Sequence, residues 1–289
     1  MQLLLINKNN QVLDLLNNRS KFIMKGVEGL HGIETDIAET ESAYMDGAEI
    51  EKVKALPRGI EIVLKLNGNV KASIDYITSI VKSKQYVTLR EIDGKRDITI
   101  KGIVTIPPYT RMMRSCEITI TVYCGQPYWE DLNYVVDTLS EFISWLYFPV
   151  EGQYFPVEGR PFGVYGIDLK KTFINTGDVS VGAVFSLVAL AEVVNPRISC
   201  SSGEQNGWYM QLNVNLQSTD ELKICTEKGN KYITINGEET YNGEPILNSL
   251  VFNGSDWLQL EQGENTFNVT ADSGASNITL DVIYKGRYE

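Results

Sequence analysis

Side chains that could catalyse a reaction are few in this chain of 289 residues. Its one histidine, His31, stands between glycines in Gly29-Leu30-His31-Gly32, so any Ser-His-Asp or Cys-His group would have to include it. The sequence contains neither the GxSxG turn of serine hydrolases nor the GxxxxGK[ST] and GxGxxG loops that bind phosphates. A histidine in a glycine-flanked loop is typical of a position without catalytic function. We therefore expect no catalytic residue and no nucleotide cofactor.

Carboxylates are the remaining side chains that could serve as catalytic groups. Glycoside cleavage requires two of them on either side of a sugar bond, and the chain has 37 acidic residues. Candidates in the second half are Glu227, Glu238, Glu239 and Asp256. Nothing in their spacing selects a pair, so the pattern favours a solvated acidic surface. A cell-wall hydrolase is the weakest of the functions that we consider.

Metal sites are not expected either. One histidine excludes a histidine-rich zinc site, and no Asp-x-Asp-x-Asp-Gly calcium loop occurs, although a β-sandwich could still bind calcium through backbone carbonyls. The four cysteines are too far apart for a CxxC site, and we expect them to be buried free thiols. They are Cys116, Cys124, Cys200 and Cys225.

Two tryptophans are weak candidates for stacking on a sugar ring. Trp208 and Trp257 both fall in expected strands of the second half, where a tryptophan more often belongs to the core. The net charge of −11 and the absence of clustered Lys and Arg argue against a nucleic-acid partner. The apolar start Leu3-Leu4-Leu5-Ile6 is too short for a signal peptide, and no window is long enough to span a membrane. We expect a soluble protein without membrane insertion.

The first half is expected to be rich in strands. Runs of Ile, Val, Thr and Tyr predict strands over residues 2–6, 21–27, 49–56, 60–66, 86–91, 98–106 and 117–124. Asp93-Gly94, between two alternating runs, predicts a tight hairpin. Apolar residues at helical spacing predict one amphipathic helix over Val70–Val81, packed on the sheet. A second helical pattern runs from Leu132 to Leu146, although its aromatic, β-branched end would also suit an extended arm.

A tandem repeat follows this first half. Tyr-Phe-Pro-Val-Glu-Gly occurs at 147–152 and again at 154–159. Each Phe-Pro step is extended, because proline biases the residue before it toward β or polyproline II. We expect residues 1–146 to form one domain, residues 147–165 an extended connector, and residues 166–289 a second domain. Phe148, Phe155 and Phe162 are candidate anchors of the connector.

The second half predicts a different architecture. About nine short alternating runs, separated by Asn-Gly turns at intervals of 8 to 12 residues, indicate an antiparallel β-sandwich. The fold class is therefore mainly β: an N-terminal β-rich domain with one packed helix, and a C-terminal sandwich.

Several segments, taken in order, resemble one known family. In the first half they are Gly32-Ile33-Glu34-Thr35, Met45-Asp46-Gly47-Ala48, Arg58-Gly59-Ile60-Glu61-Ile62, Arg96-Asp97-Ile98-Thr99-Ile100-Lys101-Gly102, and Glu117 to Cys124 followed by Pro127-Tyr128-Trp129. In the second half they are Asn175-Thr176-Gly177-Asp178-Val179, Asn195-Pro196, Leu222-Lys223-Ile224-Cys225-Thr226, Trp257-Leu258-Gln259-Leu260, Gly263-Glu264-Asn265 and Ile283-Tyr284-Lys285-Gly286-Arg287-Tyr288. Together they are similar to the distal tail protein (Dit) family of phages with long non-contractile tails.

The resemblance implies a structural function. Members of the family form rings, commonly of six subunits, that join the tail tube to the tail-tip or baseplate proteins. It implies a galectin-like C-terminal sandwich, a hexamer or two stacked hexamers, and as partners the tail tube protein, a tail-associated protein and a receptor-binding protein. It also implies a place at the tail tip of the virion after synthesis in the host cytoplasm.

The hairpin at Asp93 and Gly94 is the candidate subunit contact, since a hairpin can add strands to a neighbouring sheet. The alternative function is a carbohydrate-binding sandwich that recognises the host surface. Carbohydrate binding would depend on Trp208 or Trp257, whereas a ring subunit needs neither residue.

Overall fold

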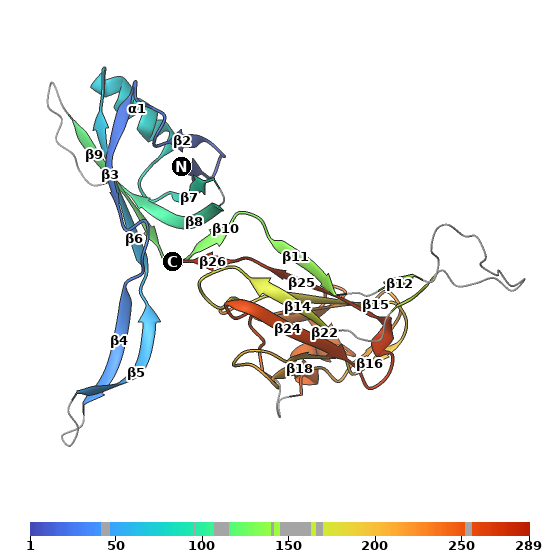
Figure 1. Cartoon of the computed structure of the whole chain (residues 1–289). Coiled ribbons are helices and arrows are strands. Elements are labelled where there is room, and N and C mark those ends of the chain that lie inside the picture. Colours follow the sequence, from blue (N-terminus) through green and yellow to red (C-terminus); the bar gives the residue numbers. More distant parts are fainter. Residues whose placement is uncertain are drawn as a thin grey trace, which may run out of the picture. The chain divides into compact units, whose positions relative to one another are not determined.

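The computed structural model describes residues 1–41, 47–94, 96–106, 116–139, 142–144, 163–165, 170–251 and 256–289. These residues form two compact units (Figure 1). Unit 1 comprises Met1–Leu132 together with Arg287–Glu289, and unit 2 comprises Asn133–Gly286. The chain therefore passes from one unit to the other twice, after Leu132 and after Gly286.

Unit 1 is built on a nine-stranded antiparallel sheet. Its strands are β1 (Gln2–Asn7), β2 (Val12–Asp14), β3 (Phe22–Glu28), β6 (Arg58–Leu66), β7 (Tyr86–Asp93), β8 (Arg96–Thr105), β9 (Glu117–Cys124), β10 (Trp129–Asp131) and β26 (Arg287–Tyr288). The order across the sheet is β2-β1-β7-β8-β9-β6-β3, and β10 pairs with both β8 and β26. The sheet thus has β2 at one edge and β3 at the other.

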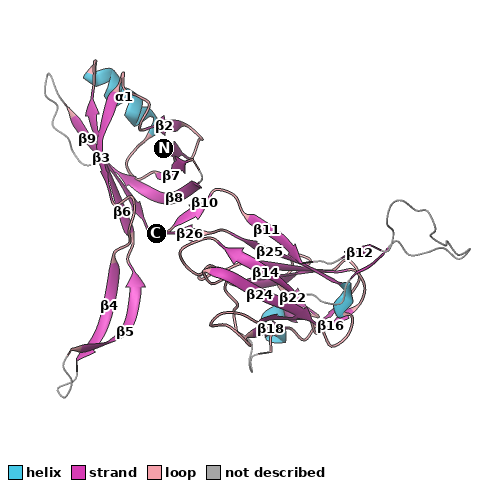
Figure 2. Cartoon of the chain, in the orientation of Figure 1, coloured by secondary structure: helices cyan, strands magenta, loops and turns pink. Residues whose placement is uncertain are grey.

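Alternation of apolar residues buries one face of this sheet. In β6, Ile60, Ile62 and Leu64 are fully buried while the residues between them face outward. The helix α1 (Val70–Ile80) covers that core with Ile77 and Ile80. The predicted helix is confirmed, and it is the one α-helix among the described residues (Figure 2).

The predicted hairpin at Asp93-Gly94 is also present. Asp93 pairs with Arg96, and Gly94 has φ = 52°, a conformation that costs glycine little. Both strands of this hairpin lie inside the sheet, because β7 also pairs with β1 and β8 also pairs with β9. Our expectation that this hairpin adds strands to a neighbouring sheet is therefore wrong, since neither strand offers a free edge. Contact through its tip stays a prediction.

A second hairpin leaves the same sheet between β3 and β6. Its strands are β4 (Thr35–Glu41) and β5 (Ala48–Ala55), which pair with each other in a separate two-stranded sheet (Figure 1). We call β4 and β5 the hairpin arm. Of its two strands the sequence predicted only β5, because the run Thr-Asp-Ile-Ala-Glu-Thr-Glu of β4 is too polar to stand out as a strand.

Unit 2 is a sandwich of two antiparallel sheets. The five-stranded sheet has the order β11 (Val135–Leu139), β25 (Ile278–Tyr284), β15 (Val184–Ala189), β20 (Glu221–Cys225) and β21 (Tyr232–Ile235). The four-stranded sheet has the order β14 (Lys170–Asn175), β24 (Gly263–Thr270), β17 (Arg197–Cys200) and β18 (Tyr209–Gln211). Phe185 of the first sheet packs edge-on against Phe267 of the second, with ring centroids 5.3 Å apart, so the two inner faces share one core.

Small elements complete unit 2. They are the pairs β12 (Phe142–Ser144) with β13 (Gly163–Tyr165), β16 (Val193–Val194) with β19 (Asn215–Leu216), and β22 (Thr240–Tyr241) with β23 (Glu244–Pro245), and the short 3₁₀ helices η1 (Ile246–Ser249) and η2 (Ala275–Asn277).

The second predicted helix, over 132–146, is wrong. Residues Val135–Leu139 form strand β11, which pairs with β25 from Val135 opposite Tyr284 to Leu139 opposite Leu280. The β-branched residues of this run favour an extended backbone, and a partner strand some 140 residues away in the sequence decides the outcome. The spacing of apolar residues within residues 132–146 does not reveal this distant partner strand.

The predicted domain boundaries also need correction. The division lies after Leu132 rather than after 146, and residues 287–289 return to unit 1. The predicted connector 147–165 does not join the two units, because β12 and β13 on either side of the repeat pair antiparallel and both belong to unit 2. Phe148, Phe155 and Phe162 lie outside the described residues.

The predicted fold class is confirmed: the protein is mainly β, with one packed helix in the N-terminal part and an antiparallel sandwich in the C-terminal part. The four cysteines are buried and free, as the sequence predicted. Within the described residues, no helix has the length and apolar character to span a membrane. The same residues contain no cluster of three or more His, Cys, Asp or Glu side chains that could hold a metal ion.

Candidate interaction surface

One face of the hairpin arm carries three large apolar residues that no other described residue of its unit covers. Ile37 lies directly opposite Val53, and a register shift after Ala38 places Glu39 opposite Ile50. Two residues directly opposite each other on paired strands point to the same face of the ribbon, and so do residues two apart along one strand. Ile37, Ile50 and Val53 therefore share a face. They are 49%, 60% and 57% exposed. Large apolar residues grouped at this exposure indicate a surface that binds another chain.

The opposite face of the hairpin arm is charged. Asp36 pairs with Lys54 and Ala38 with Lys52, which puts two lysines near the base of the arm. Four exposed glutamates lie toward the outer end of the arm: Glu39 and Glu41 on the face of Ile37 and Ile50, Glu49 on the opposite face, and Glu51 at the register shift. The Thr40 hydroxyl donates a hydrogen bond to Glu51. The acidic residues of the arm are therefore concentrated in its outer half, where they lie on both faces, while its large apolar residues share one face.

The base of the arm is fixed to the sheet through the carbonyl of Leu30. This oxygen accepts a hydrogen bond from Nη1 of Arg58 at 2.6 Å and another from the indole Nε1 of Trp129 at 2.9 Å. Arg58 and Trp129 are buried, in β6 and β10. The backbone N–H of Leu56 also donates to the carbonyl of Glu34, at 2.8 Å, where the two strands leave the body. These contacts set the position from which the arm projects.

Arg58 is a buried cation with incomplete hydrogen bonding. It is 5% exposed, and its Nε and Nη2 have no hydrogen-bond partner among the described residues. Burial lowers the pKa of Arg58, while the charges of Cys124 and Glu289 act in the opposite direction. Burial also raises the pKa of Cys124 to about 11, with Arg58 opposing the shift. A thiol with this pKa is neutral at physiological pH, which argues against a nucleophilic role for Cys124.

His31 lies beside this base and not in a catalytic group. Its Nε2 is 3.7 Å from Oε1 of Glu91, and its side chain is exposed. A cavity of about 560 Å³ lies next to it, lined by Gly29, His31, Gly32, Ile33, Glu34, Pro57, Arg58 and Gly59. Neither a serine nor a cysteine lines this cavity within the described residues, so the arrangement offers no nucleophile for His31 to activate.

The candidate carboxylates of unit 2 lie on its surface. Glu238, Glu239 and Asp256 are exposed and Glu227 is half-buried. The arrangement gives no support to a glycosidase site.

The two tryptophans occupy different environments. Trp208 is 43% exposed in the turn before β18, where its carbonyl accepts a hydrogen bond from the N–H of Cys200 at 2.8 Å. Trp257 packs against the core of unit 2, and Nζ of Lys231 lies 4.9 Å from the centre of its ring. One face of Trp257 is therefore occupied, and of the two tryptophans Trp208 has the more accessible ring.

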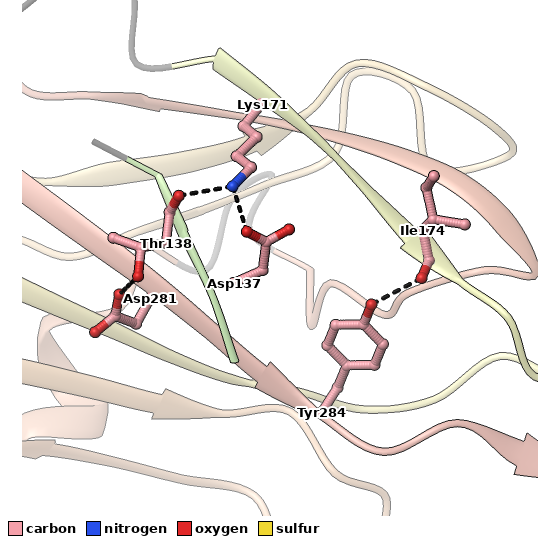
Figure 3. Close-up of polar contacts among 6 residues, drawn as sticks. All are labelled: Asp137, Thr138, Lys171, Ile174, Asp281 and Tyr284. Atoms are coloured by element: carbon pink, nitrogen blue, oxygen red, sulfur yellow. Dashed lines mark hydrogen bonds and ion pairs between the residues drawn. The ribbon is translucent and has the colours of Figure 1, made fainter. Parts of the chain in front are cut away.

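Polar contacts fasten β11 to the opposite sheet of the sandwich (Figure 3). The ammonium of Lys171 in β14 forms an ion pair with Asp137 and donates to the carbonyl of Thr138 at 2.8 Å. The hydroxyl of Tyr284 in β25 donates to the carbonyl of Ile174 at 2.7 Å. The Lys171 contacts fasten β11, the first strand of unit 2, to the opposite sheet, and the Tyr284 hydrogen bond fastens its neighbour β25 to the same strand β14.

Only part of this surface could be predicted from the sequence. It predicted β5 but not β4, and so it missed the shared face of Ile37, Ile50 and Val53. The signal that could have revealed the arm is the pair of lone aliphatic residues Ile37 and Val53, on either side of the turn dipeptide Asp46-Gly47. Ile50 joins the face of these two residues only through the register shift after Ala38, which the sequence does not mark.

Comparisons with known proteins agree with this architecture. Residues 176–288 match the family model described as the C-terminal domain of the siphovirus-type tail component. The crystal structure of the Dit protein (gp 19.1) of phage SPP1, described as a paradigm of the hub adsorption apparatus in phages infecting Gram-positive bacteria, matches over 99% of both chains with a TM-score of 0.66 and 13% identity. A chain of the phage P2 baseplate, in its activated conformation with Ca, is similar over 99% of this chain and 97% of that one, with a TM-score of 0.41 and 13% identity.

No match was found among curated proteins. The family match covers most of unit 2, and the similarity to the SPP1 protein extends through unit 1 as well. Residues 176–288 thus match the siphovirus-type tail component family, and the chain as a whole shares the fold of the SPP1 Dit protein.

Proposed function

We propose that this chain is the subunit of a hexameric ring at the distal end of a long non-contractile phage tail. The ring joins the tail tube to the tail-tip or baseplate proteins. The chain is then a structural component of the virion, synthesised in the host cytoplasm, with the tail tube protein, a tail-associated protein and a receptor-binding protein as partners. The family match of unit 2 supports the place in the tail, and the hairpin arm supports the ring.

The uncovered face of the hairpin arm is the observation that carries this proposal. A two-stranded ribbon is at best marginally stable alone in water, and this one leaves Ile37, Ile50 and Val53 half exposed or more. Burying each of these side chains against another chain would contribute roughly 1 kcal/mol. Contact with a second copy would therefore stabilise both the arm and the assembly.

The position of the arm favours a ring over a symmetric dimer. It emerges between β3 and β6, at one edge of the nine-stranded sheet, while the opposite edge is formed by β2. An element at one edge that meets a different surface of the next copy makes a head-to-tail contact, and such contacts close into rings when the rotation between copies permits. Six copies is the number that the family resemblance suggests.

A second function, carbohydrate binding by unit 2, has one observation in its favour. Trp208 is 43% exposed and could stack on a sugar ring. Binding of host-surface saccharides that is lost in Trp208→Ala, with Trp257→Ala unchanged, would favour this alternative. It is compatible with a ring and would add host recognition to it.

The ring is tested by disrupting the apolar face of the arm. The double variant Ile50→Asp/Val53→Asp should sediment as a monomer at concentrations where the unaltered chain forms large species, because charged side chains cannot be buried in the contact. The matched control is Ile174→Asp, which changes a residue of similar exposure (57%) in unit 2 and should still assemble.

Thermal unfolding followed by circular dichroism separates a failure to assemble from a failure to fold. Because the arm makes no part of the core of unit 1, the double variant should keep the melting temperature of the unassembled chain. If it assembles as well as the control, the arm is not the ring contact.

A further inference from the structure

A basic pocket lies at the other edge of the sheet from the hairpin arm. It has a volume of about 540 Å³ and is formed by the turn between β1 and β2 and by the segment that follows α1. Its lining residues are Asn7, Lys8, Asn9, Gln11, Ser79, Lys82, Ser83, Lys84, Gln85 and Tyr86. We call it the lysine pocket. Because β2 is the edge strand there and the arm leaves between β3 and β6, pocket and arm lie at opposite edges of one sheet.

The walls of the lysine pocket are held together by hydrogen bonds. Asn7 is buried, and its Nδ2 donates to the carbonyl of Ile80 at 2.9 Å, which ties the β1–β2 turn to the end of α1. Its Oδ1 accepts from the backbone N–H groups of Asn9 and Gln11 at 2.9 and 3.0 Å. On the other wall, Oγ of Ser83 accepts from the N–H of Ile106 at 3.1 Å. The pocket is therefore preformed.

The charge of the pocket is entirely positive. Lys8, Lys82 and Lys84 are exposed, none of the lining residues is acidic, and none of these three lysines forms an ion pair with any described residue. This is unusual for a chain of net charge −11, in which carboxylates outnumber basic groups. Three unpaired ammonium groups around one concave surface are suited to carboxylates on a partner.

The outer half of the hairpin arm supplies carboxylates of that kind. Glu39, Glu41, Glu49 and Glu51 are exposed. The arm and the pocket lie at opposite edges of the sheet, and a head-to-tail contact brings opposite edges of successive copies together. We propose that the lysine pocket of one copy binds the acidic outer half of the hairpin arm of the next copy. This inference rests on the proposed ring and specifies which surfaces meet in it.

Charge reversal on both sides tests the contact in the full-length chain. Lys8→Glu/Lys82→Glu should weaken assembly about tenfold or more, because like charges then face each other across the interface. Glu41→Lys/Glu49→Lys should weaken it similarly. When the two double variants are mixed, each offers a surface complementary to one surface of the other, and mixing should restore assembly. The matched control, Lys65→Glu/Lys71→Glu, reverses two exposed lysines of unit 1 outside the pocket and should assemble like the unaltered chain.

Sedimentation velocity at a series of concentrations reports each of these results, and circular dichroism verifies that every variant is folded. Restoration by mixing supports the inference even if one double variant alone is less stable. Assembly of both reversed variants at the level of the control overturns the inference and leaves the ring standing. An unaltered chain that stays monomeric overturns the ring, and the inference with it.

A nucleic acid is the other polyanion that the lysines could bind. Titration of a fluorescent DNA oligonucleotide into the unaltered chain and into Lys8→Glu/Lys82→Glu distinguishes the two. Binding that is lost in the variant, while assembly is unaffected, would assign the pocket to nucleic acid and overturn the inference.

Discussion

At the scale of single residues, Arg90 and Asp97 show how unit 1 fastens neighbouring strands. Nε and Nη2 of Arg90 in β7 donate to the two carboxylate oxygens of Asp97 in β8, at 2.7 and 2.6 Å. The hydrogen bonds from Arg90 lower the pKa of Asp97 below its usual value of 3.8, although burial opposes this shift. The pair is partly exposed, so its contribution is modest.

Asp97→Asn should lower the free energy of unfolding at pH 7 by roughly 0.5 to 1 kcal/mol. Because the folded-state pKa lies below the unfolded one, this stabilisation is present above about pH 4 and is lost as the pH falls through the folded value. Urea unfolding at pH 7, 5 and 3 measures it. Asp93→Asn, at the exposed tip of the same hairpin, is the control. If the difference in free energy of unfolding between the unaltered chain and Asp97→Asn is the same at pH 3 as at pH 7, the ion pair is not its source.

Gly102 in β8 is a residue whose small size the packing requires. A Cβ atom at this position would lie 2.6 Å from Cγ1 of Val122 and 2.7 Å from the carbonyl oxygen of Tyr123. Gly102→Ala should therefore destabilise unit 1 by about 1 to 3 kcal/mol. Gly59→Ala in β6 is the matched control, because a Cβ there meets nothing within 4 Å. Equal melting temperatures for the two variants would contradict the packing argument.

At the scale of elements, the sequence predicted correctly those helices and hairpins whose formation depends on residues close together in the chain. The α1 helix carries its own period and its own cap, since Oδ1 of Asn69 accepts from the N–H of Ala72 at 3.2 Å. The β7–β8 hairpin carries its own turn at Gly94. By contrast, β11 depends on β25 far along the chain, and β4 depends on β5 across the arm. The sequence could not reveal either partner, nor could it reveal that Leu30, Arg58 and Trp129 meet at the base of the arm.

The tandem repeat belongs to the element scale as well. Because β12 and β13 pair on either side of the repeat, deleting one repeat unit, Gln153–Gly159, shortens the connection between two paired strands. Loop length affects the closure entropy only weakly, so the free energy of unfolding should change by less than about 1 kcal/mol and assembly should persist. Chemical unfolding and sedimentation of the deletion variant measure both. Loss of assembly in a folded deletion variant would place the repeat in a subunit contact.

At the scale of the whole molecule, the two units have separate cores and different tasks in this account. Unit 1 supplies the arm and the lysine pocket at opposite edges of one sheet. Unit 2 carries the family match and the exposed Trp208. The sequence predicted two parts of different class but placed the boundary too late, because it assigned β11 to a helix of the first part.

The central claim, that copies of this chain close into a ring, is tested most directly by native mass spectrometry of the purified chain over a range of concentrations. We predict one dominant assembly with six times the mass of the chain, or twelve times if two rings stack, and its conversion to monomer in Ile50→Asp/Val53→Asp. A chain that remains monomeric at every concentration, and also in the presence of the tail tube and tail-associated proteins, would contradict it.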